Sequence, residues 1–132
     1  MDDTEITYEW PDNYPEEVPP EDSIPAKGIA YRFVKKIPPD ENDFLMSREE
    51  VPDRNLETEI DIARSYGVSL FTKPEALEKK RRYHPLSKIV FGTLVPELGK
   101  MSKKPSRRKH FTLWKCCNSK PHLHINKELK TK

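Results

Sequence analysis

The distribution of proline is the feature that most limits what this chain can fold into. Thirteen of the 132 residues are proline, and five of them fall within the first 27 positions. Proline lacks a backbone N–H and fixes one backbone angle, so it breaks helices and is excluded from central strands. Residues 1–27 are therefore predicted to be a disordered tail, and regular elements are expected between the later prolines.

The charges of the chain are segregated along its length. Residues 1–22 carry nine acidic residues and no Lys or Arg, residues 23–71 have a net charge of −2, and residues 72–132 have a net charge of +13. The overall charge of +2 hides this asymmetry. Three aromatic residues lie among the acids of the tail: Tyr8, Trp10 and Tyr14. Such a tail is expected to dock on a basic partner or on the basic half of the same chain.

Length and composition predict one small domain. The chain is 34% hydrophobic and 35% charged, which suits a modest core with part of the chain outside it. It contains no run of about 18 apolar residues, so no membrane span or membrane partner is expected. The acidic N-terminus excludes a secretory signal, and two cysteines without such a signal favour the reducing cytoplasm.

Hydrophobic periodicity predicts an α+β domain over residues 28–117 with the element order βαβαββ. The predicted strands and helices are, in chain order, 29–37, 52–67, 67–72, 72–85, 87–96 and 110–116. In the first strand, Ile29, Tyr31, Phe33 and Ile37 are expected on one face, and Arg32 and Lys36 on the other. Thr72 and Glu75 fit a capping box for the second helix. Residues 118–132 are predicted to be a polar basic tail, with His122 to Ile125 as an optional edge strand.

Cysteine and histidine near the C-terminus raise the question of a metal site. The four residues concerned are Cys116, Cys117, His122 and His124. Zinc sites usually space two cysteines by two to four residues, and adjacent cysteines do not easily give two tetrahedral ligands. A reduced thiol pair is therefore expected, with no metal and no cofactor. Histidine is a common acid–base group, so His84 and His110 are candidates for such chemistry, but neither has a nucleophile at a recognisable spacing.

The segment 97–109 is predicted to be a long basic loop. Its expected phosphate-binding residues are Lys103, Lys104, Arg107, Arg108 and Lys109. Phe111 and Trp114 follow in a strand with apolar neighbours, so they are expected in the core and not on a base-stacking surface. The sequence contains no RNP, helix-turn-helix or zinc-finger signature. Charge, more than aromatic stacking, therefore favours nucleic acid or a nucleotide as ligand.

The stretch GVSLFTKPEALEKK, a G-x-S-x-x-T strand followed by a P-E-A helix, resembles the middle core strand and helix of the ADP-ribosyltransferase-like fold. The resemblance spans about residues 29–95. It implies that Tyr31 and Arg32 form an aromatic–Arg pair at an NAD pocket, and that Ser69 and Thr72 shape the nicotinamide site. The family also uses a late acidic residue, usually Glu, on a strand after the third, and HFTLWKC offers none. Some relatives use histidine in place of the usual residues, so the implied catalytic set is completed by His110.

The succession of YR, PP-x-x-x-DF, G-x-S-x-F and H-x-T-x-W also resembles small uncharacterised bacterial proteins, a resemblance that implies no activity.

The sequence leads to three hypotheses about function. The chain is a binding module in which Arg32 and the basic loop hold nucleic acid or a nucleotide, masked by the acidic tail. Alternatively, it is a toxin-like enzyme of the ADP-ribosyltransferase type that uses NAD. In the third, it is an accessory factor that binds a protein partner through Trp10 and Tyr14. Convergence of Arg32, Ser69 and His110 on one cleft would favour the enzyme.

Overall fold

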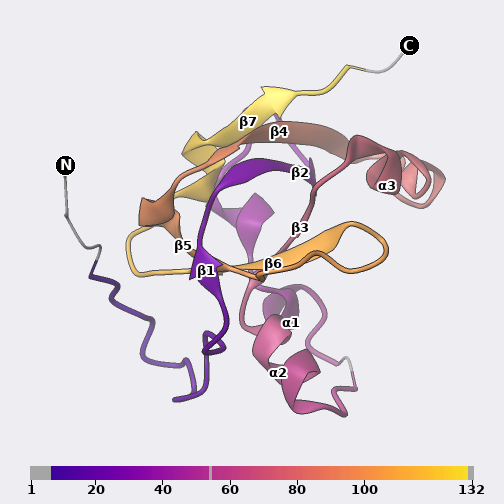
Figure 1. Ribbon diagram of the computed structural model, residues 1–132. Helices are drawn as coiled ribbons and strands as arrows, with labels where there is room; N and C mark the ends of the chain where they lie inside the picture. Colours follow the sequence, from indigo (N-terminus) through magenta and orange to yellow (C-terminus); the bar gives the residue numbers. More distant parts are fainter. Residues whose placement is uncertain (1–6, 54, 131–132) are drawn as a thin grey trace.

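The computed structural model describes residues 7–53 and 55–130, which form one α+β domain built on a curled antiparallel sheet (Figure 1). The seven strands lie in the order β1-β5-β6-β3-β2-β4-β7. Their bounds are Ile24–Pro25 (β1), Gly28–Val34 (β2), Val68–Phe71 (β3), Lys88–Leu94 (β4), Gly99–Met101 (β5), His110–Lys115 (β6) and Ile125–Glu128 (β7). The α-helices are Ser47–Glu50 (α1), Glu59–Ser65 (α2) and Pro74–Glu78 (α3), and the 3-10 helices are Glu41–Phe44 (η1), Arg81–Tyr83 (η2), Pro96–Leu98 (η3) and Pro121–Leu123 (η4).

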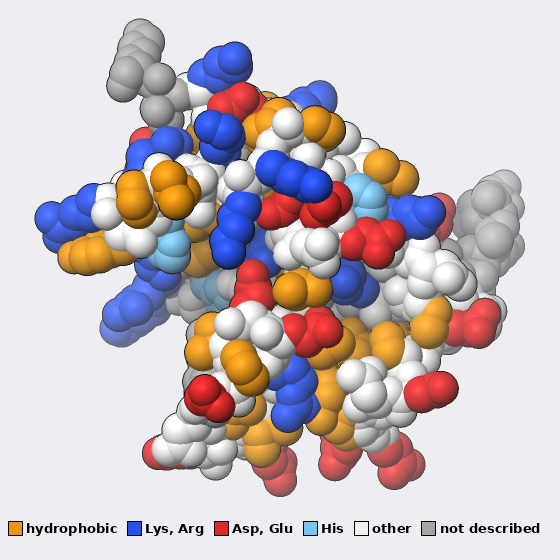
Figure 2. All heavy atoms as spheres, turned by 180° about the vertical axis from the view of Figure 1, so that it is seen from behind, with side chains coloured by type: hydrophobic (Ala, Val, Ile, Leu, Met, Phe, Trp, Pro, Cys, Tyr) orange, Lys and Arg blue, Asp and Glu red, His pale blue; other side chains and the backbone are white. Residues whose placement is uncertain are grey.

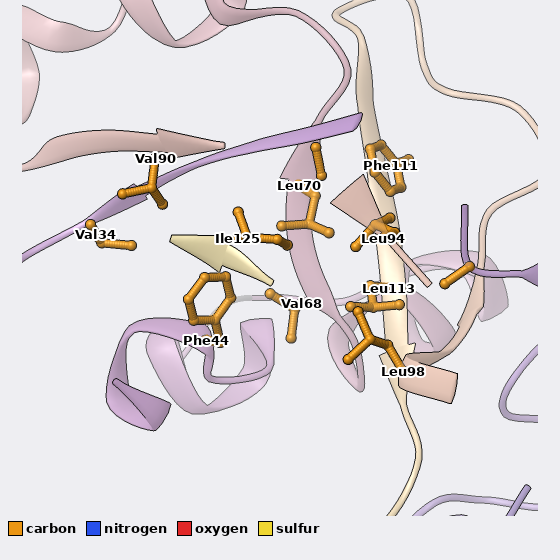
Figure 3. Close-up of a cluster of buried hydrophobic side chains, with 12 residues drawn as sticks. Val34, Phe44, Val68, Leu70, Val90, Leu94, Leu98, Phe111, Leu113 and Ile125 are labelled. Carbon is orange, nitrogen blue, oxygen red and sulfur yellow. The ribbon is translucent and has the colours of Figure 1, made fainter. Parts of the chain in front are cut away.

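The main core lies inside the curl of the sheet (Figure 3). Alternate residues of several strands point into it, as the two-residue period of a strand requires. Val68 and Leu70 enter from β3, and Phe111 and Leu113 enter from β6. Phe44 of η1 closes the core and is fully buried. The prediction that Phe111 and Trp114 are buried in the domain is confirmed, so neither ring is free to stack on a base.

The face of β2 that carries Arg32 is the one turned to the main core. Ile29 is 54% exposed, whereas Arg32 is only 6% exposed. Ala30 and Val34 face the main core beside Arg32, while Tyr31 and Phe33 pack into a second cluster beneath α3. Both faces of β2 are covered, so its alternating pattern did not reveal which face is the inner one. The consequence is that a guanidinium enters the interior.

The predicted α+β class is confirmed, but the elements differ in detail. Strands β1, β5 and β7 lie outside the predicted order βαβαββ. The optional edge strand at 122–125 overlaps β7 at Ile125 alone, because residues 121–123 form η4. The second predicted helix is short, and Lys73 precedes it without a side-chain cap. The hydroxyl of Thr72 instead donates to the carbonyl of Lys109 at 3.4 Å, so the predicted capping box is wrong.

The predicted disordered tail is ordered where the structure describes it. Ile24 of β1 pairs with Met101 of β5, and Val18 is buried. Trp10 and Tyr14 stack on each other with ring centroids 6.0 Å apart, and both pack against the cluster formed by Val18, Ala63 and Trp114. Aromatic burial thus holds this segment to the sheet despite its prolines and acids. Residues 1–6 and 131–132, which belong to the two predicted tails, lie outside the described residues.

The helices in the described part of the chain are short, and none has the length and apolar character needed to cross a membrane.

Replacing Tyr14 with Ala tests whether the N-terminal segment is bound to the domain. Tyr14 donates to the carbonyl of Lys115 at 3.2 Å and contacts the ring of Tyr66 edge-on at 5.8 Å. Loss of this half-buried side chain is expected to lower the free energy of unfolding by about 2 kcal/mol. Urea denaturation measures this. Tyr83→Ala is the matched control, since Tyr83 is 68% exposed and its loss should leave stability unchanged. Equal stability of the two variants would contradict the docking of the segment.

The stability of the protein should depend on pH through Tyr14. Burial raises the pKa of Tyr14 well above its ordinary value of 10.0, because the phenolate is disfavoured away from water. The stabilisation by neutral Tyr14 is therefore complete below pH 10 and is lost as the pH rises above it. Denaturation on both sides of pH 10 should show a steeper alkaline loss of stability in the wild type than in Tyr14→Phe. Parallel curves for the two proteins would contradict it.

Candidate functional site

Strands β2 and β3 are neighbours in the sheet but share one register pair, Tyr31 opposite Phe71. Beyond this pair a ladder of backbone hydrogen bonds does not continue. The side chain of Arg32 fills the resulting gap, and its Nη1 donates to the carbonyl oxygen of Ser69 at 2.7 Å. A backbone acceptor at the point where the strands part is thus satisfied by a side chain.

Arg32 also binds the segment that connects β2 to α2. Its Nε donates to the carbonyl of Asp43 at 2.6 Å, and its Nη2 forms an ion pair with Oε2 of Glu50 at 2.8 Å. The guanidinium carbon lies 5.4 Å from the centre of the Phe44 ring. Burial lowers the pKa of Arg32, and the carboxylate of Glu50 opposes this shift. Each terminal nitrogen carries a second N–H besides the one used in these bonds.

The loop that presents Asp43 to Arg32 is held by its own hydrogen bonds. The carboxylate of Asp43 accepts from the backbone N–H of Lys35 at 2.8 Å and from that of Asp40 at 3.2 Å. Asp40 in turn accepts from the N–H of Asn42 at 2.9 Å. This capping arrangement fixes η1, so the carbonyl that receives the guanidinium is positioned before any ligand arrives.

Ser69 and His110 form a direct side-chain contact across β3 and β6. The register pairs Ser69 with Thr112 and Phe71 with His110, which puts all four side chains on one face of the sheet. Nε2 of His110 lies 2.6 Å from the hydroxyl oxygen of Ser69. The His110 ring also meets the Phe71 ring edge-on, with centroids 5.3 Å apart. A hydroxyl and an imidazole in such contact can exchange a proton with each other or with a bound group.

Arg32, Ser69 and His110 line a single cleft of about 1160 Å³, together with Glu50. The rings of Phe33, Phe71 and His84 also contribute to its walls. In Figure 2, which looks onto the face of the molecule opposite to that in Figure 1, basic side chains gather around the α3 end and acidic side chains around the α1–α2 end. Three of the four predicted catalytic residues therefore meet in one place.

Tyr31, the fourth predicted catalytic residue, lies elsewhere. It neighbours Arg32 in a strand and so points to the opposite face from Arg32. Its register with Phe71 puts it on the same face as Ser69 and His110, but its ring lies 5.8 Å from that of Phe91 and does not line the cleft. The Tyr31–Arg32 pair implied by the resemblance therefore does not share a pocket. Thr72 is likewise not among the residues that line the cleft.

Glu50 is the residue of the cleft that the sequence analysis did not assign. It comes from α1, where Ser47 and Glu50 fit a capping pattern, and it matches no catalytic motif. Its side chain is 38% exposed, so it combines contact with the buried Arg32 and access to the cleft. The sequence gives no sign that Glu50 contacts Arg32, because Arg32 is 18 positions away and lies in a strand.

The predicted phosphate-binding residues lie on the β5–β6 hairpin. Lys103, Lys104 and Arg107 to Lys109 are all exposed. The tip of the hairpin is a closed turn, in which the N–H of Ser106 donates to the carbonyl of His110 at 2.7 Å and Lys109 adopts a left-handed backbone angle of 64°. The basic residues are thus held at the end of the strand that begins with His110.

The cysteine and histidine residues near the C-terminus do not form a metal centre in the described ranges. Within residues 7–53 and 55–130, no three His, Cys, Asp or Glu side chains are grouped so that they could hold a metal ion. The thiol of Cys116 donates to the carbonyl of Glu97 at 3.2 Å. Burial raises the pKa of Cys116, which disfavours the thiolate that a metal or a nucleophilic role requires.

Comparison with known proteins finds no match for this chain among family models, curated proteins or solved structures. The function of the cleft is therefore argued from its own geometry.

Arg32 variants test whether the guanidinium holds the cleft together. Arg32→Ala leaves three acceptors without their donor and is expected to lower the free energy of unfolding by about 3 kcal/mol. Arg32→Lys keeps the charge but not the planar fork, so an intermediate loss is expected. Urea denaturation measures both. Lys36→Ala is the control, since Lys36 pairs with Asp40 at the surface and its loss should have no measurable effect. An Arg32→Ala variant as stable as the control would show that the hydrogen bonds and the ion pair of Arg32 do not stabilise the fold.

Proposed function

We propose that the cleft binds a phosphate-bearing nucleotide and that its chemistry is of the ADP-ribosyltransferase type, with NAD as substrate. The observation that carries the proposal is the meeting of Arg32, Ser69 and His110 in one cleft. Ser69 is 37 positions from Arg32 and 41 from His110. Short motifs that matched by chance would give no reason for these residues to meet, so their convergence favours the enzyme over the alternatives.

The lining of the cleft suits a nucleotide. The second N–H groups of Arg32 and the ammonium of Lys80 are donors for phosphate oxygens. Phe33, Phe71 and His84 offer rings against which a base or a nicotinamide can stack. A volume of about 1160 Å³ is sufficient for a ligand larger than a single small molecule.

The proposed reaction breaks the bond between the nicotinamide nitrogen and the ribose carbon. Nicotinamide leaves with the bonding electrons, and an acceptor forms a new bond to that carbon and gives up a proton. A sugar carbon in such a reaction becomes oxocarbenium-like, which a carboxylate stabilises. Strand β6 has no acid for this task, and Glu50 is the carboxylate of the cleft that contacts Arg32. The Ser69–His110 pair is suited to take the proton of the acceptor.

Binding of a phosphate-bearing ligand without chemistry is the second candidate. It is favoured by the Arg32–Glu50 ion pair, since Glu50 then serves only as the counter-ion of a buried guanidinium. Masking by the acidic segment is part of this candidate. Among the described residues, no ion pair joins that segment to the basic hairpin. The contacts that support masking are the pairing of β1 with β5 and the position of the Lys100 ammonium 5.7 Å from the centre of the Tyr8 ring.

Purified protein should release nicotinamide from NAD or transfer labelled ADP-ribose to a component of cell extract. Glu50→Gln keeps a hydrogen-bond acceptor for Arg32 but removes the charge, so turnover is expected to fall about 100-fold while NAD binding changes little. Chromatography of nicotinamide measures turnover, and calorimetry with NAD measures binding.

Glu49→Gln is the matched control, because Glu49 lies on the same short helix and accepts from the N–H of Met46. Its turnover should equal that of the wild type. Absence of NAD loss and of label transfer in the wild type would end the enzymatic proposal. Binding of ADP in that case would support the second candidate, and absence of both would exclude the two together.

A further inference from the structure

The connection from α3 to β4 exposes an aromatic ring among basic residues. Tyr83 is 68% exposed, and the guanidinium carbon of Arg82 lies 4.9 Å from the centre of its ring. The N–H of Tyr83 donates to the carbonyl of Lys80 at 2.9 Å within η2. The ring is therefore presented on a defined turn, in contrast to Phe111 and Trp114, which are buried.

This turn lies beside the basic hairpin at the end of β3. The ammonium of Lys80 lies 5.3 Å from the centre of the Phe71 ring, which in turn contacts the ring of His110. The N–H of Thr72 donates to the carbonyl of Lys109 at 2.8 Å. Two segments far apart in the sequence thus meet around Phe71. We call residues 79–83 and 103–109 together the basic strip.

The charge of the basic strip is almost unopposed within it. The two segments contain nine Lys and Arg residues and no acidic residue. Among the residues that the structure describes, one of the nine is in an ion pair, Arg81 with Glu78 at 3.2 Å. Across the cleft, α1 and α2 carry four acidic residues, Glu49, Glu50, Glu59 and Asp61, against two arginines, Arg48 and Arg64. Figure 2 shows the same change of sign across this face of the molecule.

We propose that the basic strip binds a single-stranded nucleic acid, with Tyr83 stacking on a base. The lysines and arginines fit the phosphates of the backbone, and an exposed ring next to an arginine fits an unpaired base. A duplex would use the same charges but would gain nothing from Tyr83, because its bases are already stacked on each other. The four acids of α1 and α2 outnumber their two arginines, and this net negative charge across the cleft favours binding of a polyanion on the strip.

This inference goes beyond the proposed function and does not rest on it. Lys80 belongs to the strip and His110 follows its last residue, and both line the cleft, so a strand bound to the strip lies at the mouth of the cleft. Binding of the nucleic acid and turnover of NAD are measured in separate assays. A protein that fails to bind the nucleic acid can still turn over NAD, and the reverse is also true.

Fluorescence anisotropy of the full chain with a labelled DNA single strand of about 12 nucleotides tests the proposal. Affinity should fall steeply with salt and exceed that for the same sequence as a duplex. Tyr83→Ala should weaken single-strand binding about tenfold, and Tyr83→Phe should keep it, since the ring is retained. An unchanged duplex affinity in Tyr83→Ala identifies the loss as stacking.

The role of the positive charges is tested with two double variants that have the same net charge. Changing Lys103 and Lys104 to Gln should weaken binding and reduce its dependence on salt. Changing Lys120 and Lys127 to Gln, which lie on the η4–β7 side of the sheet, should leave both as in the wild type. The thermal midpoint of every variant should match that of the wild type, because all these side chains are exposed.

Five outcomes would overturn the proposal. The first four are no binding of the single strand at low salt, binding by Tyr83→Ala equal to that of the wild type, equal or tighter binding of the duplex, and equally tight binding of heparin or polyglutamate. The last two of these four would make the strip a general polyanion surface. Equal losses in the two double variants would also contradict it, since they would show that net charge alone matters.

Discussion

The fold around the cleft depends on the burial of one guanidinium. A charge removed from water is costly unless hydrogen bonds and a counter-ion replace its hydration. Arg32 obtains these from three places: the carbonyl of Asp43, the carbonyl of Ser69 and the carboxylate of Glu50. Because the groups belong to η1, β3 and α1, the positions of these elements relative to β2 are coupled. Displacing one of them leaves a buried charge short of a partner.

The cleft is a consequence of this coupling. The guanidinium occupies the gap where β2 and β3 part, and the connection that supplies Asp43 and Glu50 becomes one wall. The opposite wall begins at Phe71, against which Lys80 and His110 both lie. The α1–α2 wall has a net negative charge and the opposite wall a net positive one, a polarity that would draw an anionic ligand to the side of Lys80. A binding role and a catalytic role are both consistent with this polarity. Glu50 would be the counter-ion of Arg32 in the first and the carboxylate that stabilises the reacting sugar in the second.

Local patterns in the sequence predicted much of the fold. The strands at 29–37, 67–72, 87–96 and 110–116 were recognised because alternating or continuous apolar residues mark them directly. Strands β1 and β5 have two and three residues, too few to carry a period, and exist because they pair with each other and with β6. The order of residues 7–27 was missed for a similar reason. Its prolines and acids indicate disorder, whereas the packing of Trp10 and Tyr14 depends on a surface formed by distant parts of the chain.

The sequence by itself determined the α+β class, the short elements between prolines, the separation of acidic and basic halves, and the candidates Arg32, Ser69 and His110. Tertiary structure decided which face of β2 is buried, that Tyr31 points away from Arg32, and that Glu50 joins the cleft. The reason is the range of the interactions. Period and turn chemistry act over a few residues, whereas the contacts of the site join groups 18, 37 and 41 positions apart, which only the folded sheet brings together.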